Sequence, residues 1–215
     1  MLGKTVALLE SRLGEQLAEL VVKHGGRPFR APALAEIPDI DSGFVARLLE
    51  ELHAAPARVA IFQTGVGTSA LFRTTDALKL TEAGARVIVQ RYGAANPELE
   101  QALHARGAEA IVIPVYRWSL PEDTRPLIGL MDALARREID AVVFTSASQA
   151  HNLFALATEL GRAEALAADL GRTLVASIGP VATRALRRYG MQVGVEPSPP
   201  KLGPLITALD QALSR

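Results

Sequence analysis

The chain has 215 residues, 49% of them hydrophobic and 21% charged, a composition typical of a soluble globular protein that excludes a disordered chain. Its 23 Lys and Arg balance its 23 Asp and Glu, so overall charge predicts neither a nucleic-acid partner nor a membrane surface. Cysteine is absent, which excludes disulfides and thiolate chemistry and favours a cytoplasmic location. The N-terminal charges at Lys4, Glu10 and Arg12 surround a short apolar run, which predicts a first strand and not a signal peptide.

Short apolar runs alternate with longer amphipathic segments along the chain, which predicts an α/β fold with mostly parallel sheets. Helices are expected between the strands, and those over 13–24 and 97–106 are followed by glycine, as is common at helix C-termini. The expected strands, in chain order, are 5–9, 27–31, 59–63, 86–90, 110–115, 141–145, 174–178 and 192–195.

Two proline-containing stretches interrupt the alternation, 32–38 (PALAEIP) and 114–121 (PVYRWSLP), and neither can continue a helix. We interpret them as two crossings between domains. Residues 1–34 and 117–215 then form one discontinuous α/β domain, and residues 37–114 form a second domain inserted in it. Two ordinary surface loops are the alternative interpretation.

An internal repeat favours two related domains. Segment 59–72 (VAIFQTGVGTSALF) aligns without a gap with segment 141–154 (AVVFTSASQAHNLF). Four positions match at fixed spacing, including Phe62 with Phe144 and Phe72 with Phe154. Both segments are typical of a strand, a small hydroxyl-rich loop and a helix start.

Three loops join an expected strand to an expected helix through small or hydroxyl residues. Loops of this kind expose backbone N–H groups at the positive end of a helix dipole and therefore suit anions. For any one of them, N-capping without a ligand is the commoner role. They consist of Thr64, Gly65, Val66, Gly67 and Thr68; of Ser146, Ala147, Ser148 and Gln149; and of Ser177, Ile178, Gly179 and Pro180.

The segment GVGTSA (65–70) fits the pattern G-x-G-x-x-A of dinucleotide-binding folds. The next expected strand ends in Gln90 and Arg91 without the acidic residue that would hold a ribose, so the fit is weak. Arg91 leaves an NADP-dependent oxidoreductase open as a minor hypothesis. The four histidines fall singly, and the sequence predicts no metal site, no Walker loop and no G-x-S-x-G elbow.

Tyr116 stands at the second proposed crossing, between Val115 and Arg117. A phenol can donate a hydrogen bond and act as an acid without being ionised. The alternative is an aromatic side chain that packs on one domain.

In combination these segments resemble the uroporphyrinogen-III synthase family. The resemblance is carried by TGVG, by RYGAANPELEQALHARGAEAIVIPVYRWSLPEDT, by AVVFTSASQAHNLF, by ASIGPVATRALRRYG and by EPSPPKLGPLITAL, in the order of the family. It implies two parallel-sheet α/β domains joined by a two-stranded linker, the middle domain inserted in the first. It also implies a cyclising lyase of heme biosynthesis, a monomer without a cofactor, that converts hydroxymethylbilane to uroporphyrinogen III with loss of water and inversion of ring D.

The resemblance also implies the substrate contacts. The substrate carries a carboxylate on every acetate and propionate side chain, so helix N-termini in two facing domains, supported by basic side chains, suit it. Tyr116 matches the family's tyrosine that assists departure of the hydroxyl. The expected substrate-binding residues are Arg12, Thr64, Gly65, Gly67, Thr68, Arg91, Tyr92, Ser146, Ala147, Ser148, Gln149, Gly179, Pro180, Thr183 and Lys201.

The chain departs from the family pattern in two places. The threonine expected directly after Gly179-Pro180 is absent, so a threonine contact to Tyr116 must come from Thr183. A second Gly-Pro loop expected in the middle domain does not occur between Leu80 and Arg86. Either that segment has been deleted or residues are missing there; we favour the second, because a deletion would strip strands from a sheet and uncover its apolar faces.

A different class of function remains open at this point: a tetrapyrrole-sensing regulatory module of the same fold without catalysis. Related sequences can be fused to DNA-binding domains. The chain reaches Arg215 after an amphipathic segment with no such extension, which favours the enzyme.

Overall fold

The computed structural model describes residues 1–38, 41–55, 57, 59–62, 86–92 and 97–214. The chain forms two compact units, one of Met1–Ala35 with Ser119–Arg215 and the other of Glu36–Trp118. The first unit is therefore discontinuous in the sequence, and the residues of the second unit stand between its two segments along the chain.

The first unit is built on a four-stranded sheet in the order β2-β1-β7-β8, in which every pair of neighbours is parallel. This confirms the predicted α/β class with parallel sheets. The prediction of a strand over 192–195 is wrong, because within this segment only Val195 pairs, in a single bridge to Ala176. The strands are β1 (Thr5–Leu8), β2 (Arg27–Arg30), β7 (Ala141–Phe144) and β8 (Leu174–Ser177).

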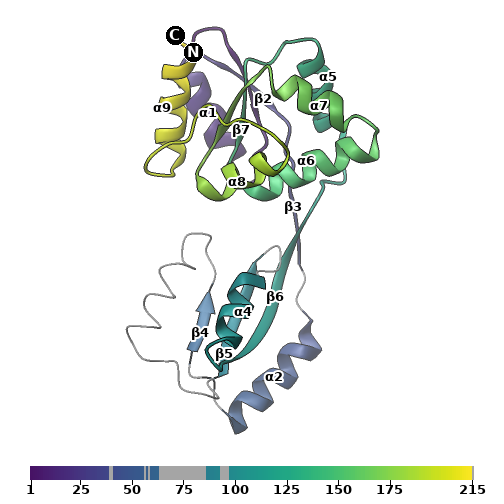
Figure 1. The fold of residues 1–215 in the computed structure, drawn as a ribbon, viewed down its shortest axis with the longest axis vertical. Helices are drawn as coiled ribbons and strands as arrows, with labels where there is room; N and C mark the ends of the chain where they lie inside the picture. Colours follow the sequence, from purple (N-terminus) through teal and green to yellow (C-terminus); the bar gives the residue numbers. More distant parts are fainter. Residues whose placement is uncertain (39–40, 56, 58, 63–85, 93–96, 215) are drawn as a thin grey trace. The chain divides into compact units, whose positions relative to one another are not determined.

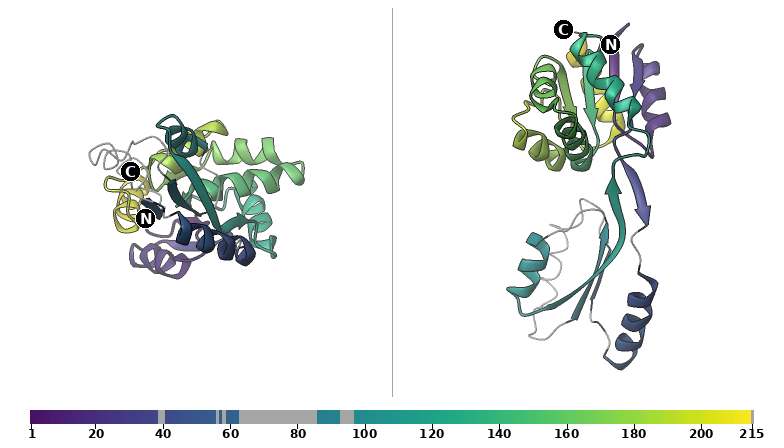
Figure 2. Two further views of the ribbon diagram at one scale, coloured as in Figure 1. Left: turned by 90° about the horizontal axis from the view of Figure 1, so that it is seen from below. Right: turned by 90° about the vertical axis from the view of Figure 1, so that its right-hand side faces the viewer.

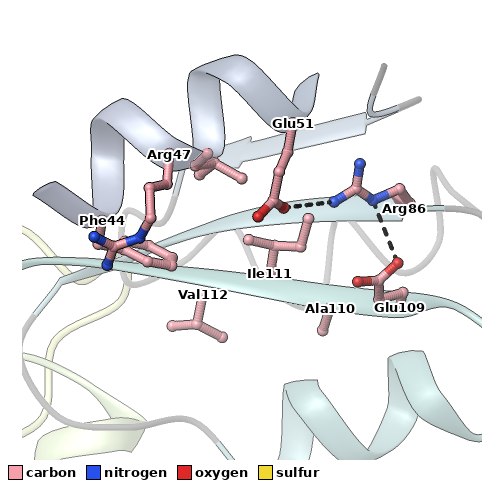
Figure 3. Close-up of a pocket in the computed structure, with 9 residues that line it drawn as sticks. Phe44, Arg47, Glu51, Arg86, Glu109, Ala110, Ile111 and Val112 are labelled. Carbon is pink, nitrogen blue, oxygen red and sulfur yellow. Dashed lines mark hydrogen bonds and ion pairs between the residues drawn. The ribbon is translucent and has the colours of Figure 1, made fainter. Parts of the chain in front are cut away.

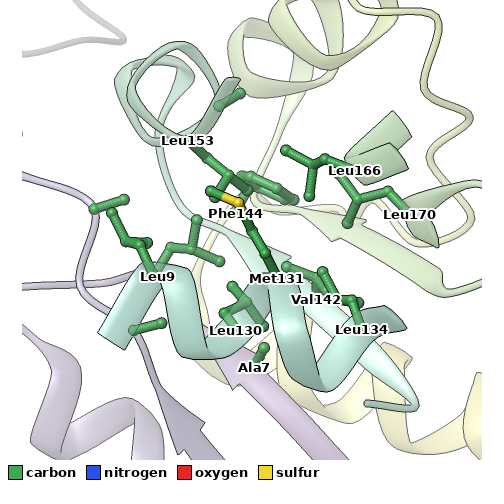
Figure 4. Close-up of a cluster of buried hydrophobic side chains, with 14 of the residues drawn as sticks. Ala7, Leu9, Leu130, Met131, Leu134, Val142, Phe144, Leu153, Leu166 and Leu170 are labelled. Carbon is green, nitrogen blue, oxygen red and sulfur yellow. The ribbon is translucent and has the colours of Figure 1, made fainter. Parts of the chain in front are cut away.

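Helices cover both faces of this sheet (Figures 1 and 2), which explains why β7 is apolar at every position and β1 at all but Thr5. On one face, side chains such as Val6 and Val143 pack with α1 (Gly14–Lys23) and α9 (Leu202–Leu213). On the other face, Val142 and Phe144 belong to a larger cluster (Figure 4). The helices of that cluster are α5 (Arg125–Ala135), α6 (Ala147–Glu159), α7 (Ala163–Leu170) and α8 (Pro180–Arg188).

The second unit holds a sheet in the order β3-β6-β5-β4, in which β4, β5 and β6 are parallel neighbours. Its described helix α4 (Pro97–His104) covers one face through Leu99 and Leu103, which pack on Val87 and Val89. The remaining elements are β3 (Ala35–Pro38), α2 (Ser42–Ala54), β4 (Val59–Phe62), β5 (Arg86–Tyr92) and β6 (Glu109–Ser119).

The proline-containing stretch 32–38 carries a strand, β3, that the sequence pattern did not predict, and the stretch 114–121 carries the end of β6, which was expected only over 110–115. Pro38 ends β3, which lies at an edge of its sheet, where a missing N–H is tolerated. Pro114 lies inside β6 and pairs with Arg91, next to the irregularity between Arg91 and Tyr92. A proline at such an irregularity costs little pairing, so β6 extends four residues past the predicted end at Val115 to Ser119.

Asp140, just before β7, forms hydrogen bonds with the residues at the start of β1. Its carboxylate accepts the Thr5 backbone N–H at 2.8 Å and the Lys4 Nζ at 2.9 Å. Burial alone would raise the pKa of Asp140, but the Thr5 N–H and the Lys4 ammonium outweigh it and lower the pKa below its usual value. A lowered pKa means that the ionised carboxylate stabilises the folded chain.

We expect Asp140→Asn to lower the free energy of unfolding by about 1 kcal/mol at pH 7, because the ion pair is half exposed and screened. The difference from the wild type should persist above about pH 4 and vanish as the pH falls through the lowered pKa of Asp140. Urea unfolding at pH 7 and pH 3 measures both values. Glu19→Gln, which removes an exposed carboxylate from α1, is the control; an equal effect of both variants at both pH values would contradict the assignment.

Candidate functional site

The carboxyl edge of the first sheet brings the predicted loops of this unit together. Because its four strands are parallel, their carboxyl ends lie along one edge, and α1, α6 and α8 begin there. In the order of the strands, the edge carries Arg30 as the last residue of β2, the segment from Glu10 after β1, Ser146 after β7 and Gly179 after β8. Such an edge is where parallel α/β sheets bind ligands.

The loop after β7 starts α6 with a capping box. The Ser146 hydroxyl accepts the Gln149 N–H at 3.3 Å, and the Gln149 side-chain oxygen accepts the Ser146 N–H at 3.3 Å. The same oxygen accepts the Thr145 N–H at 2.7 Å. The Gln149 side chain is fully buried, so it fixes this loop from within the protein.

Glu10 lies behind this loop and contacts it directly. Its Oε2 accepts the Gln149 amide Nε2 at 3.1 Å and the Thr145 hydroxyl. Its Oε1 accepts the backbone N–H groups of Arg12 and Leu13, at 3.1 and 3.3 Å, ahead of α1. These two N–H groups of the β1–α1 loop are therefore satisfied by a carboxylate of the chain itself.

The first turn of α6 keeps two backbone donors available. Within the described residues, the N–H groups of Ala147 and Ser148 have no hydrogen-bond acceptor, as expected for the first residues of a helix. Both residues are half-buried. They present N–H groups at the positive end of the α6 dipole, an arrangement suited to a carboxylate.

The loop after β8 starts α8, with Pro180 as its first residue. Gly179 has extended backbone, and a Cβ at this position would lie 3.1 Å from the Pro200 Cβ. The close approach that favours glycine here is therefore one to Pro200. No side chain among the described residues caps α8, so the N–H groups of Val181 and Ala182 also face the edge.

Thr183 is buried, and its hydroxyl makes two hydrogen bonds within the unit. It donates to the Glu196 carboxylate and lies 2.5 Å from the Ser177 hydroxyl. These bonds join the first turn of α8 to the end of β8 and to the segment that leads to α9. In this conformation the Thr183 hydroxyl is engaged inside the first unit.

Basic side chains stand along the same edge. Arg12 and Lys201 are exposed, and Lys201 is the residue that precedes α9. Arg30, which the sequence pattern did not single out, pairs with Glu15; its Nη2 would lie 3.2 Å from a Cβ on Gly14, at the start of α1. Arg12 and Lys201 therefore add positive charge to the edge that carries the backbone donors, whereas Arg30 is paired with a carboxylate.

The second unit places Tyr116 in β6, where it pairs with Tyr92 of β5, next to Arg91. The two tyrosines are thus neighbours across the β5–β6 ladder, although the side chains of all three residues lie outside what the structure describes. The loop predicted from Thr64, Gly65, Gly67 and Thr68 also lies outside the described residues, as does the stretch from Leu80 to Ala85.

A separate hollow of about 410 Å³ lies in the second unit between α2 and the strands β5 and β6 (Figure 3). Ile111 points toward α2 in it, and Phe44 also lines it. At its other end, Arg86 donates to the Ala55 carbonyl at 2.8 Å and pairs with Glu51 and Glu109, at 3.5 and 3.3 Å. Because two carboxylates already neutralise this guanidinium, this end of the hollow does not suit an anion.

The described residues contain no group of three or more His, Cys, Asp or Glu side chains placed to hold a metal ion. None of their helices has the length and apolar character needed to cross a bilayer.

Sequence reasoning missed Glu10, Thr145 and Glu196 as members of this edge. A signal existed for the first two, because both lie at the carboxyl end of a predicted strand, where side chains reach the edge. Glu196 follows the expected strand over 192–195, but nothing in its local pattern indicates a bond to Thr183.

The chain matches one family model and two other proteins. The family model described as "Uroporphyrinogen-III synthase HemD" matches residues 75–207. A Methanothermobacter thermautotrophicus protein named "Putative uroporphyrinogen-III synthase" is 40% identical over 108 residues, which span 50% of this chain and 42% of that protein. The Bacillus subtilis protein YjjA, described as uncharacterized, is 26% identical over 260 residues, 97% of this chain and 96% of that protein. Since this alignment of 260 positions is longer than the 215 residues of the chain, it contains gaps in the sequence of this chain.

Solved structures share the fold. Native uroporphyrinogen III synthase from Thermus thermophilus matches with a TM-score of 0.64 and 24% identity, over 99% of this chain and 98% of that one. A triple mutant of the same enzyme matches with a TM-score of 0.70 and 23% identity, over 99% of both chains. At this identity the likeness supports the parallel-sheet α/β architecture.

Proposed function

Because the chain belongs to the uroporphyrinogen-III synthase family, we propose that it cyclises hydroxymethylbilane to uroporphyrinogen III, with loss of water and inversion of ring D. The family match over residues 75–207 carries the proposal. The site geometry is compatible with it, because the carboxyl edge of the first sheet offers backbone donors and basic side chains to a substrate rich in carboxylates.

In this proposal the α6 and α8 N-termini hold substrate carboxylates. The donors are the N–H groups of Ala147 and Ser148 and those of Val181 and Ala182, with Lys201 as a supporting cation. Backbone donors cost little reorganisation when they bind an anion, because the helix already orients them. Single side-chain substitutions at this edge should therefore have mild effects unless they alter the backbone or add a charge.

Selectivity for the type III ring follows from positioning. The terminal pyrrole must meet the cationic methylene through its substituted carbon, a geometry that the free chain does not favour. Both ring closures are intramolecular, so the protein contributes by holding the substituent carboxylates at fixed points, in the conformer that brings the substituted carbon to the methylene.

Tyr116 is proposed to donate a hydrogen bond to the departing hydroxyl. An alcohol is a poor leaving group, and a positioned phenol assists it as an acid. We expect Tyr116→Phe to lower kcat about tenfold to a hundredfold, with the proportion of type III product unchanged. Initial rates and isomer analysis on the same samples measure both; lost isomer selectivity at full rate would contradict this role.

The decisive experiment supplies the wild-type protein with enzymatically made hydroxymethylbilane and resolves the type III from the type I isomer. A synthase yields type III in excess of the spontaneous type I ring. A product mixture unchanged from the protein-free control would overturn the proposal, and tight binding of the bilane in that case would indicate a tetrapyrrole-binding module.

A further inference from the structure

We infer that Glu10 is a positioning residue for the substrate, which holds the start of α6 in its anion-binding geometry. The inference rests on the proposed function, because it assigns a substrate carboxylate to the Ala147 and Ser148 N–H groups. Glu10 itself contacts only protein groups among its described hydrogen bonds, so its effect on the reaction is transmitted through the loop.

The Glu10 carboxylate joins two loops that are far apart in the sequence. One oxygen accepts two backbone N–H groups of the β1–α1 loop, and the other accepts Thr145 and Gln149, 135 and 139 residues away. Four donors on one carboxylate use its full accepting capacity. The position of the β7–α6 loop is thereby fixed relative to β1.

Gln149 connects the Glu10 carboxylate to the backbone of the β7–α6 loop. Its Nε2 donates to Glu10 and lies 2.7 Å from the Thr145 hydroxyl, while its oxygen accepts the Thr145 and Ser146 N–H groups. The amide cannot turn over without losing these bonds, because its side chain is fully buried. The N–H groups of Thr145, Ser146 and Gln149 are therefore hydrogen-bonded within the network. Those of Ala147 and Ser148 can donate to a ligand.

The sign of a mutational effect distinguishes positioning from charge. A carboxylate near a polyanionic substrate repels it, so if charge alone mattered, neutralising Glu10 would tighten binding. If Glu10 holds the loop, Glu10→Gln should weaken binding. The side-chain amide of glutamine has only one oxygen, so two of the four donors lose their acceptor, and we expect this loss to displace the loop.

The test compares Glu10→Gln with Thr145→Val and with the control Glu19→Gln, which removes an exposed carboxylate from α1. We expect both site variants to raise the KM for hydroxymethylbilane about tenfold with kcat within about twofold of wild type, since a displaced loop loses substrate binding. The double variant should be no worse than the stronger single one, because both break the same bridge. Glu19→Gln should match wild type. Thr145→Val keeps the test valid if Glu10→Gln does not fold.

Backbone hydrogen exchange of residues 145–148, followed by mass spectrometry, measures the loop without reference to activity. Faster exchange there in Glu10→Gln and Thr145→Val, with α7 unchanged, is the expected result. A lowered or unchanged KM, or unchanged exchange, would overturn the inference. If the wild type makes no type III product, the proposed function fails, and the exchange data together with binding of the oxidised type III porphyrin still decide whether Glu10 positions this loop for a polycarboxylate.

Discussion

Ser148→Asp is expected to lower kcat/KM for hydroxymethylbilane on the order of a hundredfold while leaving the fold intact or slightly more stable. The substitution places a carboxylate in the first turn of α6, where the proposed substrate carboxylate sits. Two like charges about 4 Å apart repel by a few kcal/mol near a protein surface, enough for such a loss. The same negative charge at a helix N-terminus stabilises the helix by about 0.3–1 kcal/mol.

The opposite signs of these two effects make the experiment decisive. Initial rates give kcat/KM, and urea unfolding gives the free energy of unfolding on the same preparation. Ala165→Asp is the matched control, because it adds an aspartate to the exposed face of the first turn of α7. Unchanged kcat/KM in Ser148→Asp would place the substrate carboxylates elsewhere and remove α6 from the site.

Phe144→Ala is expected to lower the free energy of unfolding of the first unit by about 3–5 kcal/mol. Phe144 is fully buried at the end of β7, in the cluster that includes Met131, Leu153 and Leu166 (Figure 4). Three helices contribute these side chains, so the space left by the ring cannot close without moving a helix. Since whole domains are stable by about 5–15 kcal/mol, the variant should be near the limit of folding.

Urea denaturation followed by far-ultraviolet circular dichroism measures this loss. Val22→Ala is the control, because Val22 is 58% exposed on α1 and its truncation should change the stability by less than about 0.5 kcal/mol. A loss below about 1 kcal/mol for Phe144→Ala would show that the core collapses around the space, contrary to close packing.

The strands of the first unit were predictable because most of them are short, apolar runs. β1, β7 and β8 are buried along nearly their whole length, and an apolar run of that kind between helical segments is typical of a parallel strand covered on both faces. β3 was not predictable, because its pairing partner lies more than 70 residues later and the flanking prolines are typical of a loop. The segment over 192–195 has the composition of a strand, but only Val195 pairs.

The candidate site was predictable only in its local part. The spacing from Ser146 to Gln149 indicates a capping box, and the structure contains it. The partner of Gln149 was not predictable, because a single sequence does not say that β1 lies beside β7 and so does not bring Glu10 to Thr145. Ser177, Thr183 and Glu196 meet for the same reason: their contact depends on tertiary packing and not on local pattern.

The adjacency of β1 and β7 also affects how the protein is made. Val6 pairs with Ala141, so during synthesis β1 leaves the ribosome long before its central neighbour exists. At about 5–20 residues per second, this delay is on the order of ten seconds. During that time the whole of Glu36–Trp118 emerges and can begin to fold, while β1, α1 and β2 wait with one apolar strand edge unpaired. The second unit, although later in the chain than β1, can therefore fold first.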